Sequence, residues 1–264
     1  MQRYFKIFCR VARMSLITSL MYKLDWVLGV ITTFVYTLMQ LVYIAMIFQA
    51  GQVATIGGFN VWQVALVFIF GQVVWMFAFI FIFDNVGMFR WKVMQGELDH
   101  YLLKPISSEF LLSVQKIGLV EASAMIVYAL VGLVFFGLSG KVVLSTEQWY
   151  WVGVIGGLSI VLNFCIYWLA GLVFFYWPNF LVGHWFLSNT SDVGRYPRKV
   201  YPGIMQWILT YIIPLFCVIN PVYDVLDGSG SFWRGLDIVL MTILFVLIYV
   251  FMWKDGLKRY VSAA

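Results

Sequence analysis

The chain has 264 residues, of which 63% are hydrophobic and only 11% are charged, and its mean hydropathy is +0.91. About a quarter of the residues in a soluble domain are charged, so this composition excludes an ordinary soluble protein. The net charge of +5 does not indicate nucleic-acid binding. The cations are spread over several short segments beside long apolar ones, where they suit anionic lipid headgroups. The sequence therefore predicts an all-α integral membrane protein whose partner is the lipid bilayer.

The first 25 residues predict an amphipathic helix that precedes the membrane domain. Its apolar and small side chains recur at steps of three and four residues, and four cations lie on the other side. The first set is Tyr4, Phe5, Phe8, Val11, Ala12, Ser15, Leu16 and Ser19, and the second is Arg3, Lys6, Arg10 and Arg13. Such a helix lies in the membrane interface and turns into the membrane near residue 25. The alternative is a charged tail that only sets the orientation of the chain.

Six long apolar segments follow and form one membrane domain over residues 26–264. A helix needs about 20 largely apolar residues to cross about 30 Å of hydrocarbon, and each segment comes close to this length or exceeds it. The segments are 26–48, 61–83, 117–137, 149–176, 204–220 and 236–253. The sequence therefore predicts six transmembrane helices.

The 17 Lys and Arg residues are concentrated in alternate gaps between these segments. Five precede the first segment, four lie in the second gap, three lie in the fourth gap and three follow the last segment. Only Lys141 and Arg234 occupy the gaps of the other set. Cytoplasmic loops carry the Lys and Arg excess. We expect a multi-pass protein of a bacterial plasma or inner membrane with both termini in the cytoplasm, and with Arg195, Arg198 and Lys199 on that same side.

The cytoplasmic gap between the second and third segments contains a short motif, G-E-L-D-H-Y-L-L-K-P-I-S, at residues 96–107. Gly96 permits a sharp entry and Pro105 ends a helix, so the motif predicts a short helix. Its apolar edge would be formed by Leu98, Leu102 and Leu103, flanked by Glu97, Asp99 and Lys104. This edge suits a soluble partner, whereas the simpler interpretation is an amphipathic connector.

Few polar features occur inside the predicted spans. Asn163 is the most central polar side chain and either packs helices together or lines a substrate path. Gly153 and Gly157 have the spacing that lets two helices approach closely. Pro214 predicts a kink or break in the fifth segment, which Pro221 would end. Glu121 and Asp84 lie near the cytoplasmic boundary, within reach of headgroups or Lys116.

Enzymatic chemistry has little support in the sequence. The chain lacks the G-x-x-x-x-G-K-[ST] phosphate loop, so we expect it to bind no ATP by that route. His100 and His184 do not form a catalytic group with other residues, and Cys9, Cys165 and Cys217 are too far apart to indicate a disulfide or a metal site. We therefore expect a non-catalytic chain that binds no cofactor.

The motif at residues 96–107, within a six-span chain, resembles the cytoplasmic loop of ABC-2 type permeases of ATP-binding-cassette exporters. A second run of residues supports this resemblance. It consists of Arg195-Tyr196-Pro197, Tyr201-Pro202, Leu209-Thr210, Pro214, Asn220 and Pro221. The chain departs from the family pattern at residues 222–224, where more small apolar residues are expected.

The resemblance implies a permease subunit that forms half of an export path and works with separate ATPase subunits, which bind ATP and Mg²⁺. A second permease, identical or homologous, would complete the path. The coupling helix to the ATPase would comprise Gly96, Glu97, Leu98, Asp99, Leu102, Leu103, Lys104 and Pro105. Pro214, Asn220 and Pro221 would belong to a re-entrant outer link, with a kinked span as the alternative. A membrane scaffold or channel and a membrane-embedded transferase remain the other classes of function.

Overall fold

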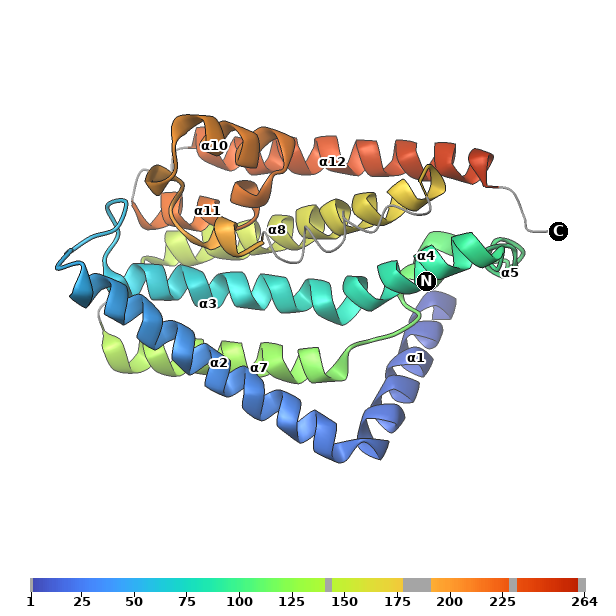
Figure 1. Cartoon of the computed structure of the whole chain (residues 1–264), viewed down its shortest axis with the longest axis horizontal. Helices are drawn as coiled ribbons and strands as arrows, with labels where there is room; N and C mark the ends of the chain where they lie inside the picture. Colours follow the sequence, from blue (N-terminus) through green and yellow to red (C-terminus); the bar gives the residue numbers. More distant parts are fainter. Residues whose placement is uncertain (1, 141–143, 178–190, 228–231, 261–264) are drawn as a thin grey trace.

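The computed structural model describes residues 2–140, 144–177, 191–227 and 232–260, in which every regular element is a helix. The helices form an elongated bundle, and its long members run between two ends (Figure 1). We name one end after α5 (Asp99–Leu102) and the other after α11 (Leu215–Leu226). The connection 51–60 lies at the α11 end, and the C-terminal part of the chain reaches the α5 end. The expected all-α fold is therefore confirmed for the described residues.

In the described part of the chain, five continuous helical stretches connect the two ends. They are α2 (Lys23–Ala50); α3 (Val61–Ala78), which continues through the π-helix η1 (Phe79–Phe83) into α4 (Asp84–Gln95); α7 (Leu119–Ser139); α8 (Thr146–Leu172) with the 3-10 turn η2 (Val173–Phe175); and α12 (Phe232–Arg259). All but α7 are long and apolar enough to cross a membrane. These stretches coincide with five of the six predicted segments.

The N-terminal helix α1 (Gln2–Met21) runs across the direction of the bundle (Figure 1). Its predicted apolar side rests on the start of α7 and on α6 (Ser108–Ser113). The Tyr4 and Phe110 rings lie 4.9 Å apart, and the Ile117 amide donates to Ser15 Oγ at 3.3 Å. The chain turns into α2 at Tyr22, slightly before the expected position.

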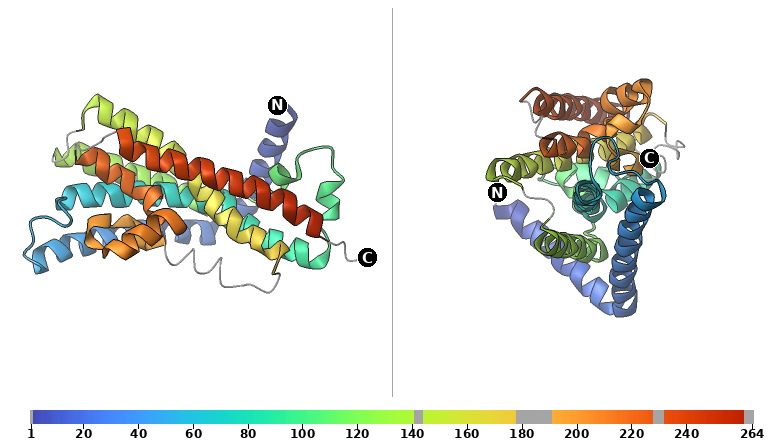
Figure 2. Two further views of the ribbon diagram at one scale, coloured as in Figure 1. Left: turned by 90° about the horizontal axis from the view of Figure 1, so that it is seen from above. Right: turned by 90° about the vertical axis from the view of Figure 1, so that its left-hand side faces the viewer.

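The core is built around α8, which packs against α12, α3 and α11. Leu162, Trp168 and Leu172 of α8 are completely buried or nearly so. Close packing between helices uses glycine where α12 meets η2, because a Cβ at Gly256 would overlap the Phe175 ring. In contrast, α2 lies at the edge of the bundle (Figure 2). In its most apolar 18-residue stretch, 11% of the residues are buried, against 56% in the corresponding stretch of α3–α4.

The segment predicted as a span with a kink or break, at residues 204–220, consists of two helical arms. The first comprises α10 (Gly203–Trp207) and the π-helix η5 (Ile208–Ile212), and the second is α11. The arms meet at an angle of 110°. Pro214 immediately precedes α11, so the predicted break is confirmed, because proline lacks the N–H that would continue the first arm. Pro221 does not end a helix but lies buried inside α11.

The two arms form a hairpin, and the start of the first arm lies beside the end of the second. The Arg198 amide, in the 3-10 turn η4 (Arg198–Val200) just before the first arm, donates to Asn220 Oδ1 at 2.7 Å. Lys199 Nζ lies 3.2 Å from Asp227 Oδ2, just after the second arm. The chain therefore enters and leaves this hairpin at the same end.

This arrangement corrects the predicted position of the fourth cationic gap. Lys199 Nζ lies 5.6 Å from the centre of the Phe59 ring, so the gap shares an end with the connection 51–60 and not with the chain termini. Residues 178–190, which separate this end of the chain from η2, lie outside the described part. His184 and Lys141, singled out in the sequence, also lie outside the described residues.

Candidate functional sites

The motif at residues 96–107 forms a tight turn at the α5 end. Gly96 ends α4 in the left-handed conformation, with φ of 73°, as its predicted role in a sharp entry requires. The Glu97 amide then donates to the Lys92 carbonyl at 3.0 Å. The helix that follows, α5, spans only four residues, so the predicted coupling helix is a single helical turn.

The three leucines of this motif do not form one edge. Leu98 is 0% exposed and belongs to the core, which corrects the prediction that it faces a partner. Leu103 is 83% exposed and Leu102 is half-exposed. The exposed face of this turn therefore consists of Leu102 and Leu103 with the exposed polar residues Glu97, His100 and Lys104 and with Pro105. We call this set the α5 face.

Tyr101 and Leu98 attach the turn to the bundle. Lys92 Nζ lies 2.7 Å from Tyr101 Oη, which in turn lies 3.2 Å from Gln115 Oε1. The ammonium groups of Lys92 and Lys104 lie 4.4 Å and 4.7 Å from the centre of the Tyr101 ring, within the range of cation–π attraction. The α5 face is thus presented by a segment that is fixed on its inner side.

Asn85, which the sequence analysis did not single out, joins α4 to the chain that leads into α7. Its buried Nδ2 lies 2.8–2.9 Å from the carbonyls of Phe81, Ser113 and Lys116. Its Oδ1 accepts from the Lys116 amide at 3.0 Å. A single amide side chain therefore bonds to four backbone groups, three of them in residues 113–116. The Lys116–Asp84 ion pair at 2.7 Å lies beside it, and both side chains are well exposed.

Glu109 is the acidic residue of α6 and lies in the same region. Burial raises the pKa of its carboxyl above the ordinary 4.5, and the charge of Lys254 opposes this shift. The ionised form of this group is therefore less favourable in the folded chain than in water.

At the α11 end, the R-Y-P sequence is attached to α11 by hydrogen bonds to its backbone. The buried Asn220 Nδ2 donates to the carbonyls of Gly194 at 2.8 Å and Tyr196 at 3.2 Å. Tyr223 Oη donates to the Arg195 carbonyl at 3.0 Å. Asn220, predicted as part of the outer link, thus holds a segment 24–26 residues away in sequence.

Two ion pairs lie beside the same attachment. Arg198 lies 3.2 Å from Asp224 in a partly buried pair, and Lys199 pairs with Asp227 at the surface. Tyr223 and Asp224 are two of the three residues, 222–224, at which the sequence departs from the family pattern. Their side chains bind the R-Y-P segment and Arg198, which gives the departure a structural reason.

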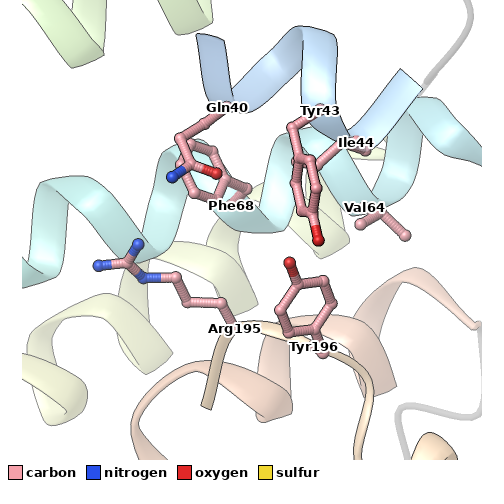
Figure 3. A pocket seen from close by; sticks show the side chains of 7 residues that line it. All are labelled: Gln40, Tyr43, Ile44, Val64, Phe68, Arg195 and Tyr196. Atoms are coloured by element: carbon pink, nitrogen blue, oxygen red, sulfur yellow. The ribbon is translucent and has the colours of Figure 1, made fainter. Parts of the chain in front are cut away.

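A polar cavity of about 160 Å³ lies between α2, α3 and the R-Y-P segment (Figure 3). Arg195 is 8% exposed, and its guanidinium carbon lies 5.5 Å from the centre of the Phe68 ring. The Tyr43 and Tyr196 hydroxyls point toward each other across the cavity (Figure 3). The lining is completed by Gln40, Ile44 and Val64. Arg195 is part of the R-Y-P run that supports the family resemblance, but its burial could not be predicted from the sequence.

The other residues singled out in the predicted spans differ in burial and in contacts. Asn163 is buried within the bundle, and its Nδ2 has no hydrogen-bond partner among the described residues. Gly153 and Gly157 are exposed, and a Cβ at either would meet nothing within 4 Å, so neither supports a close helix contact within this chain. Glu121 lines a cleft of about 450 Å³ between α1 and the start of α7.

Comparison with known proteins agrees with the motifs at both ends. A family described as "ABC-2 family transporter protein" matches residues 34–264, a range that includes the α5 face, the R-Y-P segment and the hairpin. No curated protein and no solved structure matches the chain. The matched range covers most of the sequence, and the chain therefore belongs to the ABC-2 family of transporter proteins.

Proposed function

We propose that this chain is the permease subunit of an ATP-driven exporter and forms half of its translocation path. Family membership supports the role of a transporter permease. ATP and Mg²⁺ would be bound by separate ATPase subunits, because the sequence contains no phosphate loop. The protein itself would be non-catalytic.

The observation that carries this proposal is the α5 face. Leu103 exposes 83% of its surface on a segment that is fixed from within by Leu98 and Tyr101. An exposed leucine pair on a rigid support, flanked by Glu97 and Lys104, suits docking into a cleft of a soluble partner. Closure of two ATPase subunits would move this turn as a lever. The movement would switch the permease between an inward-open and an outward-open state.

We infer the orientation of the chain in the membrane from the cations at the α5 end. Twelve of the 17 Lys and Arg residues belong to the N-terminal tail, the second gap and the C-terminal tail. This excess supports a cytoplasmic α5 end, with α1 in the cytoplasmic interface. The α11 end would then face outward, and its hairpin would be the re-entrant outer link. Arg198 and Lys199 would be tolerated there because carboxylates pair with them.

A second permease would complete the path, because α2 leaves most of its apolar surface uncovered in one chain. Either an identical chain or a homologous one would serve. The exposed Gly153 and Gly157 provide another surface for close approach between chains. The protein would reside in a bacterial inner or plasma membrane.

The test is co-purification of the tagged chain with an ABC ATPase encoded beside it, comparing wild type with Leu103→Asp. The substitution places a charge at the centre of the α5 face, and we expect at least tenfold less ATPase to co-elute. Val200→Asp is the matched control, because Val200 is an exposed apolar residue at the α11 end. Undiminished co-elution with Leu103→Asp would reject the α5 face as the docking site. A wild-type chain that purifies alone would favour a scaffold, a channel or a membrane-embedded transferase.

A further inference from the structure

We propose that the cleft between α1 and the start of α7 binds the head group of a zwitterionic aminophospholipid, with its ammonium at Glu121 and its phosphate at Lys116. The cleft is lined by α1, by residues 115–118 and by the first turn of α7, with Asp84 beside them. The inference goes beyond the proposed function, because it requires a membrane boundary at the α5 end but no ATPase.

The position and size of the cleft are the first argument. Its volume of about 450 Å³ lies within the roughly 300–1,000 Å³ of pockets that hold small ligands. Asp84 begins α4 directly after the five apolar residues of η1, and Glu121 lies in the first turn of the largely apolar α7. Helix α1 runs across the bundle at the same level (Figure 1). The cleft therefore lies at the boundary between apolar spans and polar surface, where phospholipid head groups are found.

The charges of the lining are the second argument. Asp84 Oδ2 and Lys116 Nζ lie 2.7 Å apart, so these two groups largely neutralise each other. Glu121 has no ion-pair partner in the part of the chain that the structure describes. Two carboxylates and one ammonium leave an excess of one negative charge in the cleft. A complementary ligand therefore presents a positive group to Glu121.

Hydroxyl groups of α1 favour a primary ammonium as that positive group. Ser15, Thr18 and Ser19 line the cleft from α1. The Thr18 hydroxyl donates to the Met14 carbonyl at 3.0 Å, and Ser15 Oγ accepts from the Ile117 amide at 3.3 Å. Both hydroxyl oxygens still have a lone pair for another donor. A primary ammonium has three N–H groups for the carboxylate and these oxygens, whereas the trimethylammonium of choline has none.

The rest of a phospholipid also finds partners here. The Lys116 side chain is 58% exposed, and its ammonium has three N–H donors, so it can bind a phosphate oxygen while it keeps Asp84. Apolar side chains continue the cleft on both helices. Met14 of α1 is 69% exposed, and Leu119 and Val120 belong to the lining on α7. The acyl chains can therefore extend from the cleft into the bilayer.

The floor of the cleft is fixed before a lipid arrives, which lowers the ordering cost of binding. The Lys116 amide donates to Asn85 Oδ1 at 3.0 Å, and the Gly118 amide donates to the Ile80 carbonyl at 3.0 Å. Gly118 also leaves room for the carboxylate, because a Cβ at this position would overlap Glu121 Oε2. Gly118→Ala therefore displaces the carboxylate without removing its charge.

The binding test is native mass spectrometry of the full chain in detergent micelles, with equal amounts of phosphatidylethanolamine and phosphatidylcholine of identical acyl chains. For wild type we expect about fivefold more bound phosphatidylethanolamine, as one additional charge-assisted hydrogen bond would give. Glu121→Gln should bring the two lipids within twofold of each other, and Gly118→Ala should reduce the preference at least twofold. Lys116→Gln should lower the binding of both lipids at least threefold and keep the preference, since both contain the phosphate.

The matched control is Glu147→Gln, which removes an exposed carboxylate from the first turn of α8 at the α11 end and should keep the wild-type preference. Equal binding of the two lipids by wild type would overturn the proposal, as would a folded Glu121→Gln with the wild-type preference. If Glu121→Gln does not fold, an unchanged preference in Gly118→Ala has the same consequence. Stronger binding of phosphatidylglycerol that is lost in Lys116→Gln would assign the cleft to anionic head groups and would also overturn it. Failure of the co-purification test would reject the proposed docking site and leave the lipid result intact.

Discussion

The two ends of this bundle use their polar and apolar groups in opposite ways. At the α5 end, Leu98 and Tyr101 face inward and hold a turn whose leucine pair remains uncovered. At the α11 end, Asn220 and Tyr223 bind the R-Y-P segment from within. The first end leaves an apolar surface uncovered, whereas the second satisfies its own backbone groups. Under the proposed function, the uncovered leucine pair would meet the ATPase, whereas the α11 end is held together by contacts within the chain.

The largest expected effect is on stability at the α11 end. Asn220→Ala removes one acceptor and two donor contacts inside the protein. Buried groups that lose their partners cost about 1–3 kcal/mol each, so we expect a loss of about 3 kcal/mol in the free energy of unfolding. Denaturant unfolding in mixed micelles, followed by tryptophan fluorescence, measures it. Gln95→Ala, at an exposed position at the α5 end, is the control.

A smaller loss is expected at the α5 end from Asn85→Ala, about 2 kcal/mol, because the backbone groups that it serves are only partly buried. The substitution leaves the α5 face chemically intact but loosens its support. We therefore expect weaker co-purification with the ATPase at a temperature where the variant is still folded. Unchanged co-purification would show that the α5 face does not depend on this amide.

The two ion pairs of the α11 end should differ in strength. A double-mutant cycle on Arg198 and Asp224, with alanine at each position, is expected to give a coupling of about 1 kcal/mol. The same cycle on the more exposed Lys199 and Asp227 is expected to give close to zero. If the second pair were the stronger, burial could not be the reason that the first one holds the hairpin.

The smallest effect concerns Glu109. Because burial raises the pKa of this carboxyl, the folded chain binds its proton more tightly than the unfolded chain does. Stability is then greatest below the ordinary pKa of 4.5 and falls as the pH rises through the raised value. Glu109→Gln should therefore have a higher melting temperature than wild type at pH 8 and a similar one at pH 4. A difference that does not change with pH would assign the effect to packing.

Sequence reasoning succeeded where a single local property decides the structure. The length of apolar runs located α2, α3, α8 and α12, and Gly96 and Pro214 marked a turn and a break. These features depend on chain geometry within a few residues, which the sequence contains directly.

It failed where distant residues decide. Leu98 was grouped with Leu102 and Leu103 by spacing, but a four-residue helix has too few turns for spacing to define a face. The alternation of Lys and Arg predicts the cations at 195–199 on the side of the termini, because it counts residues 204–220 as a span. The contacts of Arg198 with Asp224 and of Lys199 with Asp227, which close the hairpin, join distant parts of the chain. The cavity of Arg195 requires α2, α3 and the R-Y-P segment together, and their meeting cannot be seen in any one segment.

The most direct test of the whole account is the side of the membrane on which Lys199 lies. In a chain with Cys9→Ser, a cysteine at Lys199 and another at Leu103 are compared for labelling by a membrane-impermeant maleimide in intact cells. Both native positions are exposed, and Cys165 and Cys217 are buried. The account predicts labelling of Lys199→Cys in intact cells and of Leu103→Cys only after the membrane is opened. Labelling of both positions only after opening would place the two ends in one compartment and would contradict the account.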